Sequence, residues 1–156
     1  MNKLTNIRES LHFEDLMLYR IHEILLISSP YDSYILEQDG SLAEQIITEY
    51  IGMNLSYAPR LWNASTAGDA ISMLKTRTFD LVIIMLRISD MNPIKLSGKI
   101  KKTYPDKPII LLVFDESELK LLPKNYSNTI DNVFIWSGNS GVFPAIMKYI
   151  EDKANV

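Results

Sequence analysis

The fold of this chain is decided by the stretch Phe79-Asp80-Leu81-Val82-Ile83-Ile84-Met85-Leu86-Arg87-Ile88-Ser89-Asp90-Met91-Asn92-Pro93. Its uninterrupted apolar run, Leu81 to Leu86, predicts a central strand that is covered on both faces, as in a parallel sheet. The turn-rich residues 89–93 lead into a helix with Pro93 at its first position, where a missing N–H costs nothing. Functional groups of open parallel sheets lie at the carboxyl ends of the strands, which is where this pattern places Met85.

Helical and extended signals alternate along the rest of the chain, and this alternation indicates an α/β fold. The sequence predicts a weak strand near a sheet edge at Arg60 to Ala64. It predicts helices that begin at the capping box Ser41-Leu42-Ala43-Glu44, at Thr66 and at Pro93, and a closing helix with the apolar stripe Phe143, Ile146, Met147 and Ile150. Residues 29–40 are expected to form a long loop after the first strand.

The opening stretch resembles the phosphoacceptor strand and loop of bacterial response-regulator receiver domains, and the resemblance covers about residues 22–154. Met85 stands where the phosphorylated aspartate belongs. Residues 24–30, 108–114 and 133–137 resemble the first, fourth and fifth strands of a receiver domain. At the end of the first of these strands, Ser28 and Ser29 occupy the two acidic Mg²⁺-binding positions. At the end of the fourth, Val113 replaces the switch Thr or Ser, and Phe114 replaces the small residue after it. At the end of the fifth, Trp136 and Ser137 replace the Lys-Pro pair.

This resemblance implies a flavodoxin-like, doubly wound α/β domain with five parallel strands in the order 2-1-3-4-5 and helices on both faces. Residues 22–154 would form the receiver-like domain. Residues 1–21 would form an N-terminal helical extension, because Leu4, Ile7, Leu11 and Leu18 recur at helical spacing.

The departures at Met85, Ser28 and Ser29 indicate that receiver chemistry is absent. Aspartyl phosphorylation needs a carboxylate nucleophile and a Mg²⁺ ion, and Mg²⁺ prefers oxygen ligands that include carboxylates. We therefore expect a non-phosphorylatable pseudo-receiver that signals through protein–protein contact, with no catalytic residue, metal or cofactor. Met85, Phe114 and Trp136 are expected to fill the former acidic pocket as an apolar plug.

Several residues leave alternatives open. Asp90 is either a turn or cap residue or a substitute phosphoacceptor, and Asp32 and Asp39 are either solvated loop acids or pocket carboxylates. The turn Gly138, Asn139, Ser140 and Gly141 either caps a helix or binds an anion at its N-terminus. Residues 19–40 more weakly resemble receiver-like regions ahead of pyruvate phosphate dikinase-type PEP/pyruvate-binding domains. The alternative function is thus a regulatory domain of such an enzyme that senses a small anion.

Composition narrows the class of partner. The chain has 156 residues, a formal net charge of -3 and no cysteine, which argues against a nucleic-acid footprint, a disulfide or a thiolate metal site. The apolar runs are too short to span a bilayer and no signal peptide is recognisable, so we expect a cytoplasmic protein. The expected partner is another protein or a downstream domain, with a homodimer through residues 1–20 as a further expectation. The lysines between Lys95 and Lys107 form either a solvated face or a contact for a phosphate-bearing partner.

Overall fold

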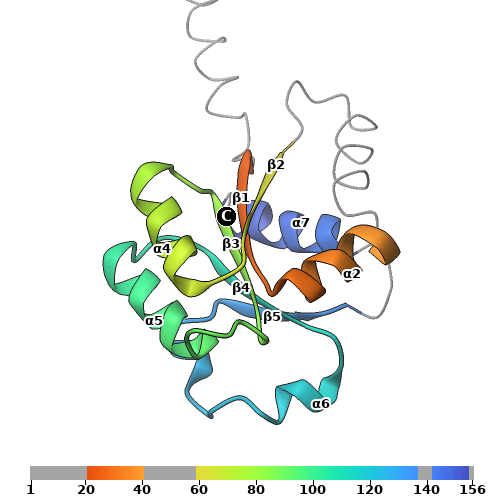
Figure 1. Cartoon of the computed structure of the whole chain (residues 1–156). Coiled ribbons are helices and arrows are strands. Elements are labelled where there is room, and N and C mark those ends of the chain that lie inside the picture. Colours follow the sequence, from red (N-terminus) through yellow and green to blue (C-terminus); the bar gives the residue numbers. More distant parts are fainter. Residues whose placement is uncertain (1–20, 41–58, 137–141, 155–156) are drawn as a thin grey trace, which may run out of the picture.

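A five-stranded parallel sheet in the order β2-β1-β3-β4-β5 forms the centre of the molecule (Figure 1). The computed structural model describes residues 21–40, 59–136 and 142–154. The strands are β1 (Glu23–Ile27), β2 (Arg60–Ala64), β3 (Leu81–Met85), β4 (Ile109–Val113) and β5 (Asn132–Ile135). This strand order confirms the predicted flavodoxin-like topology.

The three inner strands are buried and the two edge strands are partly exposed. Every residue of β3 and β4 is buried, and so is every residue of β1 after Glu23. In β2 only Ala64 is buried, and in β5 no residue is. The continuous apolar run of β3 is therefore explained by its central place, where both faces need apolar side chains.

Helices of the described residues cover both faces of the sheet (Figure 1). One face packs against α2 (Pro30–Gly40) and α7 (Val142–Ala154), and the other packs against α4 (Ala67–Thr76) and α5 (Pro93–Thr103). Alternate residues of β3 go to opposite layers, as expected of a strand. Ile83 and Met85 join the α2/α7 core, whereas Val82 and Ile84 join the α4/α5 core.

Local capping explains where the predicted helices begin. The Thr66 side chain accepts a hydrogen bond from Asp69 N at 3.0 Å at the start of α4. The Asn92 side chain accepts from Ile94 N at 2.9 Å and from Lys95 N at 3.3 Å at the start of α5. All members of the predicted stripe of the closing helix are buried: Phe143, Ile146, Met147 and Ile150.

The prediction of a long loop at residues 29–40 is wrong, because Pro30–Gly40 forms helix α2. Ser29 Oγ accepts a hydrogen bond from Asp32 N at 3.1 Å, so it satisfies a free amide of the first turn. The sequence analysis also missed the short helix α6 (Glu116–Leu119) and the 3-10 turn η1 (Tyr126–Asn128).

Other expectations fall outside the described residues. They are the N-terminal helix and its homodimer contact (1–20), the helix after the capping box (41–52) and the turn at 137–141. Within the part of the chain that the structure describes, no helix has both the length and the apolar character needed to cross a membrane.

The Asn92 cap gives a first prediction. We expect Asn92→Ala to lower the free energy of unfolding by about 1 kcal/mol, because two amides at the start of α5 lose their acceptor. Urea denaturation measures this change. The matched control is Asn92→Asp, which keeps a side-chain oxygen at the cap and should stay close to wild type. Equal losses in the two variants would contradict a capping role.

Candidate functional site

The residues singled out from the sequence lie at the carboxyl edge of the sheet. Met85 ends β3 and Val113 ends β4, while Ser28 and Trp136 directly follow β1 and β5. Trp136 N donates to Val113 O at 2.8 Å, and Ser28 N donates to Ala64 O at 3.1 Å. Parallel pairing thus continues one residue beyond the strands and holds these positions at one edge.

Met85 and Trp136 belong to one buried apolar cluster, with Phe114 packed against it. The Met85 side chain is 1% exposed and Trp136 is 5% exposed. The rings of Phe114 and Trp136 meet edge to face, with centroids 5.6 Å apart and an interplanar angle of 67°. This is a favourable geometry for aromatic pairs. We call Met85, Phe114 and Trp136 the apolar plug.

Val113 does not join the apolar plug. Its side chain is buried in the core on the α4/α5 side, whereas its neighbour Leu112 faces the α2/α7 side with Met85. The alternation of side chains along β4 accounts for this difference. The structure therefore brings together Met85 and Trp136 from the predicted set and leaves Val113 on the other face.

The hydroxyl groups of Ser28 and Ser29 already have hydrogen-bond partners. Ser28 is fully buried, its Oγ lies 2.5 Å from Ser33 Oγ, and it accepts from Asn63 Nδ2 at 2.9 Å. Ser29 caps α2 through its contact with Asp32 N. Both serines thus connect β1 to α2, and Ser28 also connects β1 to the edge strand β2.

Asp32 is the residue that sequence reasoning misplaced. Of the two alternatives for Asp32, the solvated loop acid is wrong, because this residue is buried in the first turn of α2. Its Oδ1 lies 3.4 Å from Arg87 Nη1, and its Oδ2 has no hydrogen-bond partner among the described residues. Burial raises the pKa of Asp32, while the Arg87 charge acts in the opposite direction. The signal that could have found this helix is Ser29 followed by Pro30, a common N-cap and first-turn pair.

Arg87 connects this carboxylate to the apolar plug. Its guanidinium lies 5.3 Å from the ring centroid of Phe114 and also pairs with Asp32. About half of the Arg87 side chain, 54%, remains exposed. The arginine therefore lies between the interior of the carboxyl edge and solvent.

Asp90 acts as a cap in the described structure. Its Oδ1 accepts from Ala67 N at 2.8 Å and its Oδ2 accepts from Gly68 N at 3.1 Å. These two backbone hydrogen bonds lower the pKa of Asp90. The carboxylate thereby attaches the loop after β3 to the first turn of α4.

The part of the chain that the structure describes contains no group of three or more His, Cys, Asp or Glu side chains that could hold a metal ion. Asp32 is the buried carboxylate at the carboxyl edge, and the positive charge of Arg87 next to it is unfavourable for a cation. The other side-chain oxygens described near this edge already have partners. Those of Ser28 and Ser29 bind groups of α2, and Glu118 Oε1 accepts from Phe114 N at 2.6 Å.

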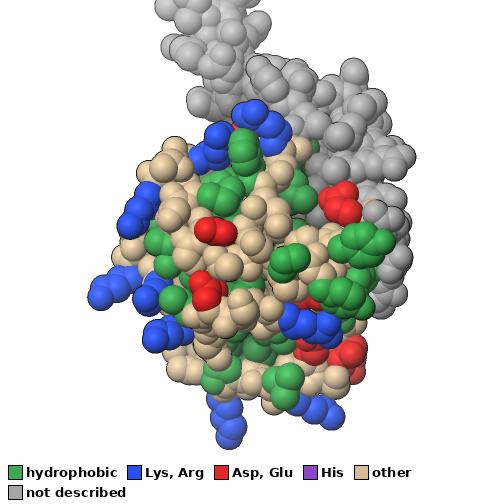
Figure 2. Space-filling model, in the orientation of Figure 1, with side chains coloured by type: hydrophobic (Ala, Val, Ile, Leu, Met, Phe, Trp, Pro, Cys, Tyr) green, Lys and Arg blue, Asp and Glu red, His purple; other side chains and the backbone are tan. Residues whose placement is uncertain are grey.

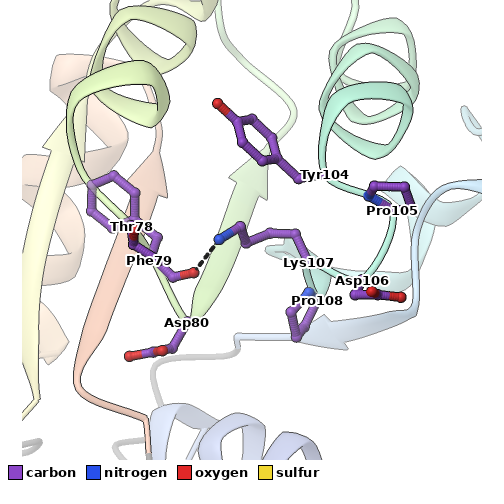
Figure 3. A pocket seen from close by; sticks show the side chains of 8 residues that line it. All are labelled: Thr78, Phe79, Asp80, Tyr104, Pro105, Asp106, Lys107 and Pro108. Atoms are coloured by element: carbon purple, nitrogen blue, oxygen red, sulfur yellow. Dashed lines mark hydrogen bonds between the residues drawn. The ribbon is translucent and has the colours of Figure 1, made fainter.

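A hollow of about 330 Å³ at the opposite, amino edge lies between the segments Thr78–Asp80 and Tyr104–Pro108 (Figure 3). Lys107 points across it and donates from Nζ to Phe79 O at 2.5 Å, and burial lowers the pKa of this amine. The carboxylate of Asp80 points away from the lysine in this view and accepts from His22 N and Glu23 N. These polar groups do not converge on a common point, and Lys107 serves to join two loops.

Comparison with models of protein families finds no match, and comparison with curated proteins finds none either. Solved structures do match. A two-component response regulator from Clostridium difficile has 22% identity and a TM-score of 0.64, over 86% of this chain and 99% of that chain. A signal receiver domain of an HD domain-containing protein from Pseudomonas fluorescens Pf-5 has 24% identity and a TM-score of 0.63, over 88% and 92%.

A third match is described as a novel family of redox sensors in the streptococci that evolved from two-component response regulators. It has 17% identity and a TM-score of 0.62, and the alignment covers 85% of this chain and 52% of that chain. These identities are low, so the likeness concerns the backbone arrangement. The chain therefore has the fold of CheY-like response-regulator receiver domains.

Proposed function

We propose that this chain is a pseudo-receiver that takes part in signal transduction through protein contact and is not phosphorylated. The observation that carries the proposal is the burial of Met85 at the carboxyl end of β3. In the receiver resemblance this position belongs to the phosphorylated aspartate. We propose a binding module rather than an enzyme.

The chemistry of the carboxyl edge supports this proposal. A thioether cannot form the acyl phosphate that a carboxylate nucleophile forms, and it is a poor ligand for Mg²⁺. Trp136 belongs to the same buried cluster as Met85, and Phe114 packs against this cluster and against the Trp136 ring. Phosphoryl transfer relies on a cation and on several hydrogen-bond donors around the phosphoryl oxygens. The apolar plug supplies no cation, and the one polar atom of its side chains that could donate is the indole nitrogen of Trp136.

Neither nearby acid is a good substitute nucleophile. Asp90 has both carboxylate oxygens engaged with the backbone amides of Ala67 and Gly68. Asp32 is buried in the first turn of α2, and its Oδ1 is paired with Arg87.

The streptococcal redox sensors provide a precedent, since they are described as having evolved from two-component response regulators. Loss of the phosphoacceptor in this chain is consistent with a similar change of role. The alternative, an anion-sensing domain of a PEP/pyruvate-binding enzyme, depends on residues 137–141, outside the described residues. None of the similar structures named above is described as an enzyme of that kind.

The packing of Met85 leads to a stability prediction. Met85→Ala should lower the free energy of unfolding by about 2 to 5 kcal/mol, because it removes buried apolar atoms and leaves a cavity beside Trp136. The control Met85→Leu conserves volume and should cost less than about 1.5 kcal/mol. A loss below about 0.5 kcal/mol for Met85→Ala in chemical denaturation would disprove the plug.

A second experiment tests phosphorylation directly. The chain is incubated with acetyl phosphate and Mg²⁺, and its intact mass is measured beside that of a receiver domain that has its phosphoacceptor aspartate. We expect an adduct on the control and an unchanged mass for this chain. A stoichiometric phosphoryl adduct on this chain would overturn the proposal, and Asp32→Asn and Asp90→Asn would then identify the acid.

Asp32 leads to a prediction of pH dependence. Burial raises its pKa above the ordinary value of an aspartate, so the folded state holds this proton in a pH range where the unfolded state has lost it. The contribution of Asp32 to stability is therefore favourable at the acidic end of this range and declines as the pH rises through the raised pKa.

Asp32→Asn removes this decline. We expect the variant to gain stability relative to wild type as the pH rises from about 4 to about 8, measured by urea denaturation at each pH. The control is Asp152→Asn, which removes one exposed carboxylate from α7. A difference between Asp32→Asn and wild type that does not change with pH would contradict a raised pKa.

A further inference from the structure

A second surface that bears on function lies between α4 and α5, away from the carboxyl edge. A cavity of about 320 Å³ separates these helices and is lined mainly by apolar side chains. We call it the α4/α5 groove. Its lining residues are Ile71, Leu74, Ile100, Thr103 and Tyr104, together with Lys75, Lys99 and Lys102.

The base of the α4/α5 groove is fixed by contacts within the domain. Leu74 and Ile100 are buried in the core that joins both helices to the sheet. Tyr104 Oη donates to Leu74 O at 3.0 Å, which ties the end of α5 to the last turns of α4. A preformed apolar groove of this kind loses little conformational entropy when it binds a partner.

The three lysines of the groove have no acidic partner in the described part of the chain. Lys75, Lys99 and Lys102 are exposed, and no described carboxylate lies within ion-pair distance of their amines. Lys101 on the same helix is different, because it donates to Asp131 Oδ2 at 2.9 Å and to Lys107 O at 2.7 Å. Of the four lysines of helix α5, Lys101 is structural, whereas Lys99 and Lys102 line the groove and remain available.

Lysines at helix ends have an ordinary explanation, since cations near the last turn are favoured by the helix dipole. Lys75 and Lys102 lie in the last turns of α4 and α5, but Lys99 does not. The dipole also gives no reason for an apolar cavity between the two helices. Figure 2 shows lysine and arginine side chains along the side of the molecule where Figure 1 places α4 and α5, although the chain has a net negative charge.

We propose that the α4/α5 groove binds an acidic segment of a partner protein that places one or two apolar side chains between the three lysines. An amphipathic helix with Asp or Glu beside its apolar stripe has this chemistry. The volume lies at the lower end of the roughly 300 to 1,000 Å³ found for ligand pockets, which suits a few side chains of a peptide. Nucleic acid would use the lysines but would leave the apolar lining without a counterpart.

This inference rests on the proposed function in one respect, because it assigns the proposed protein–protein contact to the α4/α5 groove and predicts an acidic partner. It does not depend on the chemistry at Met85. Phosphorylation of the chain would overturn the proposed function and leave binding at the groove unchanged. Failure of the groove variants described next would overturn this inference alone.

The probe is a fluorescein-labelled helical peptide of about 14 residues with a leucine and tryptophan stripe flanked by glutamates. Fluorescence anisotropy measures its affinity for the full chain, and amide NMR shifts locate the contact. We expect saturable binding that weakens as salt is raised, with shifts on α4 and α5. Peptides with lysine in place of glutamate, or serine in place of the apolar residues, should bind at least about tenfold more weakly.

The deciding variant is the triple charge reversal Lys75→Glu, Lys99→Glu and Lys102→Glu. It should weaken peptide binding by about tenfold or more. The control reverses three exposed lysines elsewhere, Lys120→Glu, Lys124→Glu and Lys148→Glu, and makes the same change in net charge. Circular dichroism melting verifies that both variants are folded. The conservative variant Ile71→Thr tests the apolar lining.

Three results would overturn the inference. They are equal binding by wild type and the groove variant, an equal loss in the control variant, and NMR shifts outside α4 and α5. Tighter binding of a single-stranded oligonucleotide that is unaffected by Ile71→Thr would assign the lysines to nucleic acid instead.

Discussion

Burial of the inner strands on both faces is the constraint on which the rest of the structure depends. Because β3 and β4 have no exposed residue, each face of the sheet needs a helical layer, and the described residues supply two helices for each face. Parallel strands then end at the same edge. The packing of the sheet therefore determines the position of Met85 and of the groups around it.

The carboxyl edge is held by packing where an active receiver would need charge balance. Several carboxylates in one pocket repel each other and require a cation, whereas the side chains of Met85, Phe114 and Trp136 carry no charge. The remaining buried carboxylate, Asp32, is paired with Arg87, whose guanidinium also lies over Phe114.

The lysines of α5 differ in their surroundings. Lys101 is committed to Asp131, and Asp131 also accepts from Ile109 N at 2.7 Å at the start of β4. Lys99 and Lys102 face the groove shared with α4. The basic stretch seen in the sequence is thus divided by helical geometry into a part that stabilises the fold and a part available to a partner.

The sequence by itself determined the central strand, the strand order through the receiver resemblance, and the starts of α4 and α5, because apolar runs and capping residues are local patterns. Tertiary structure decided what depends on distant segments. Asp32 is buried against Arg87, a residue 55 positions along the chain, and Val113 faces away from Met85 because of the alternation along β4. The α4/α5 groove exists only where two separate helices pack on the sheet. Contacts between distant segments decide on which face a side chain lies and which residues it contacts, and local sequence patterns do not determine either.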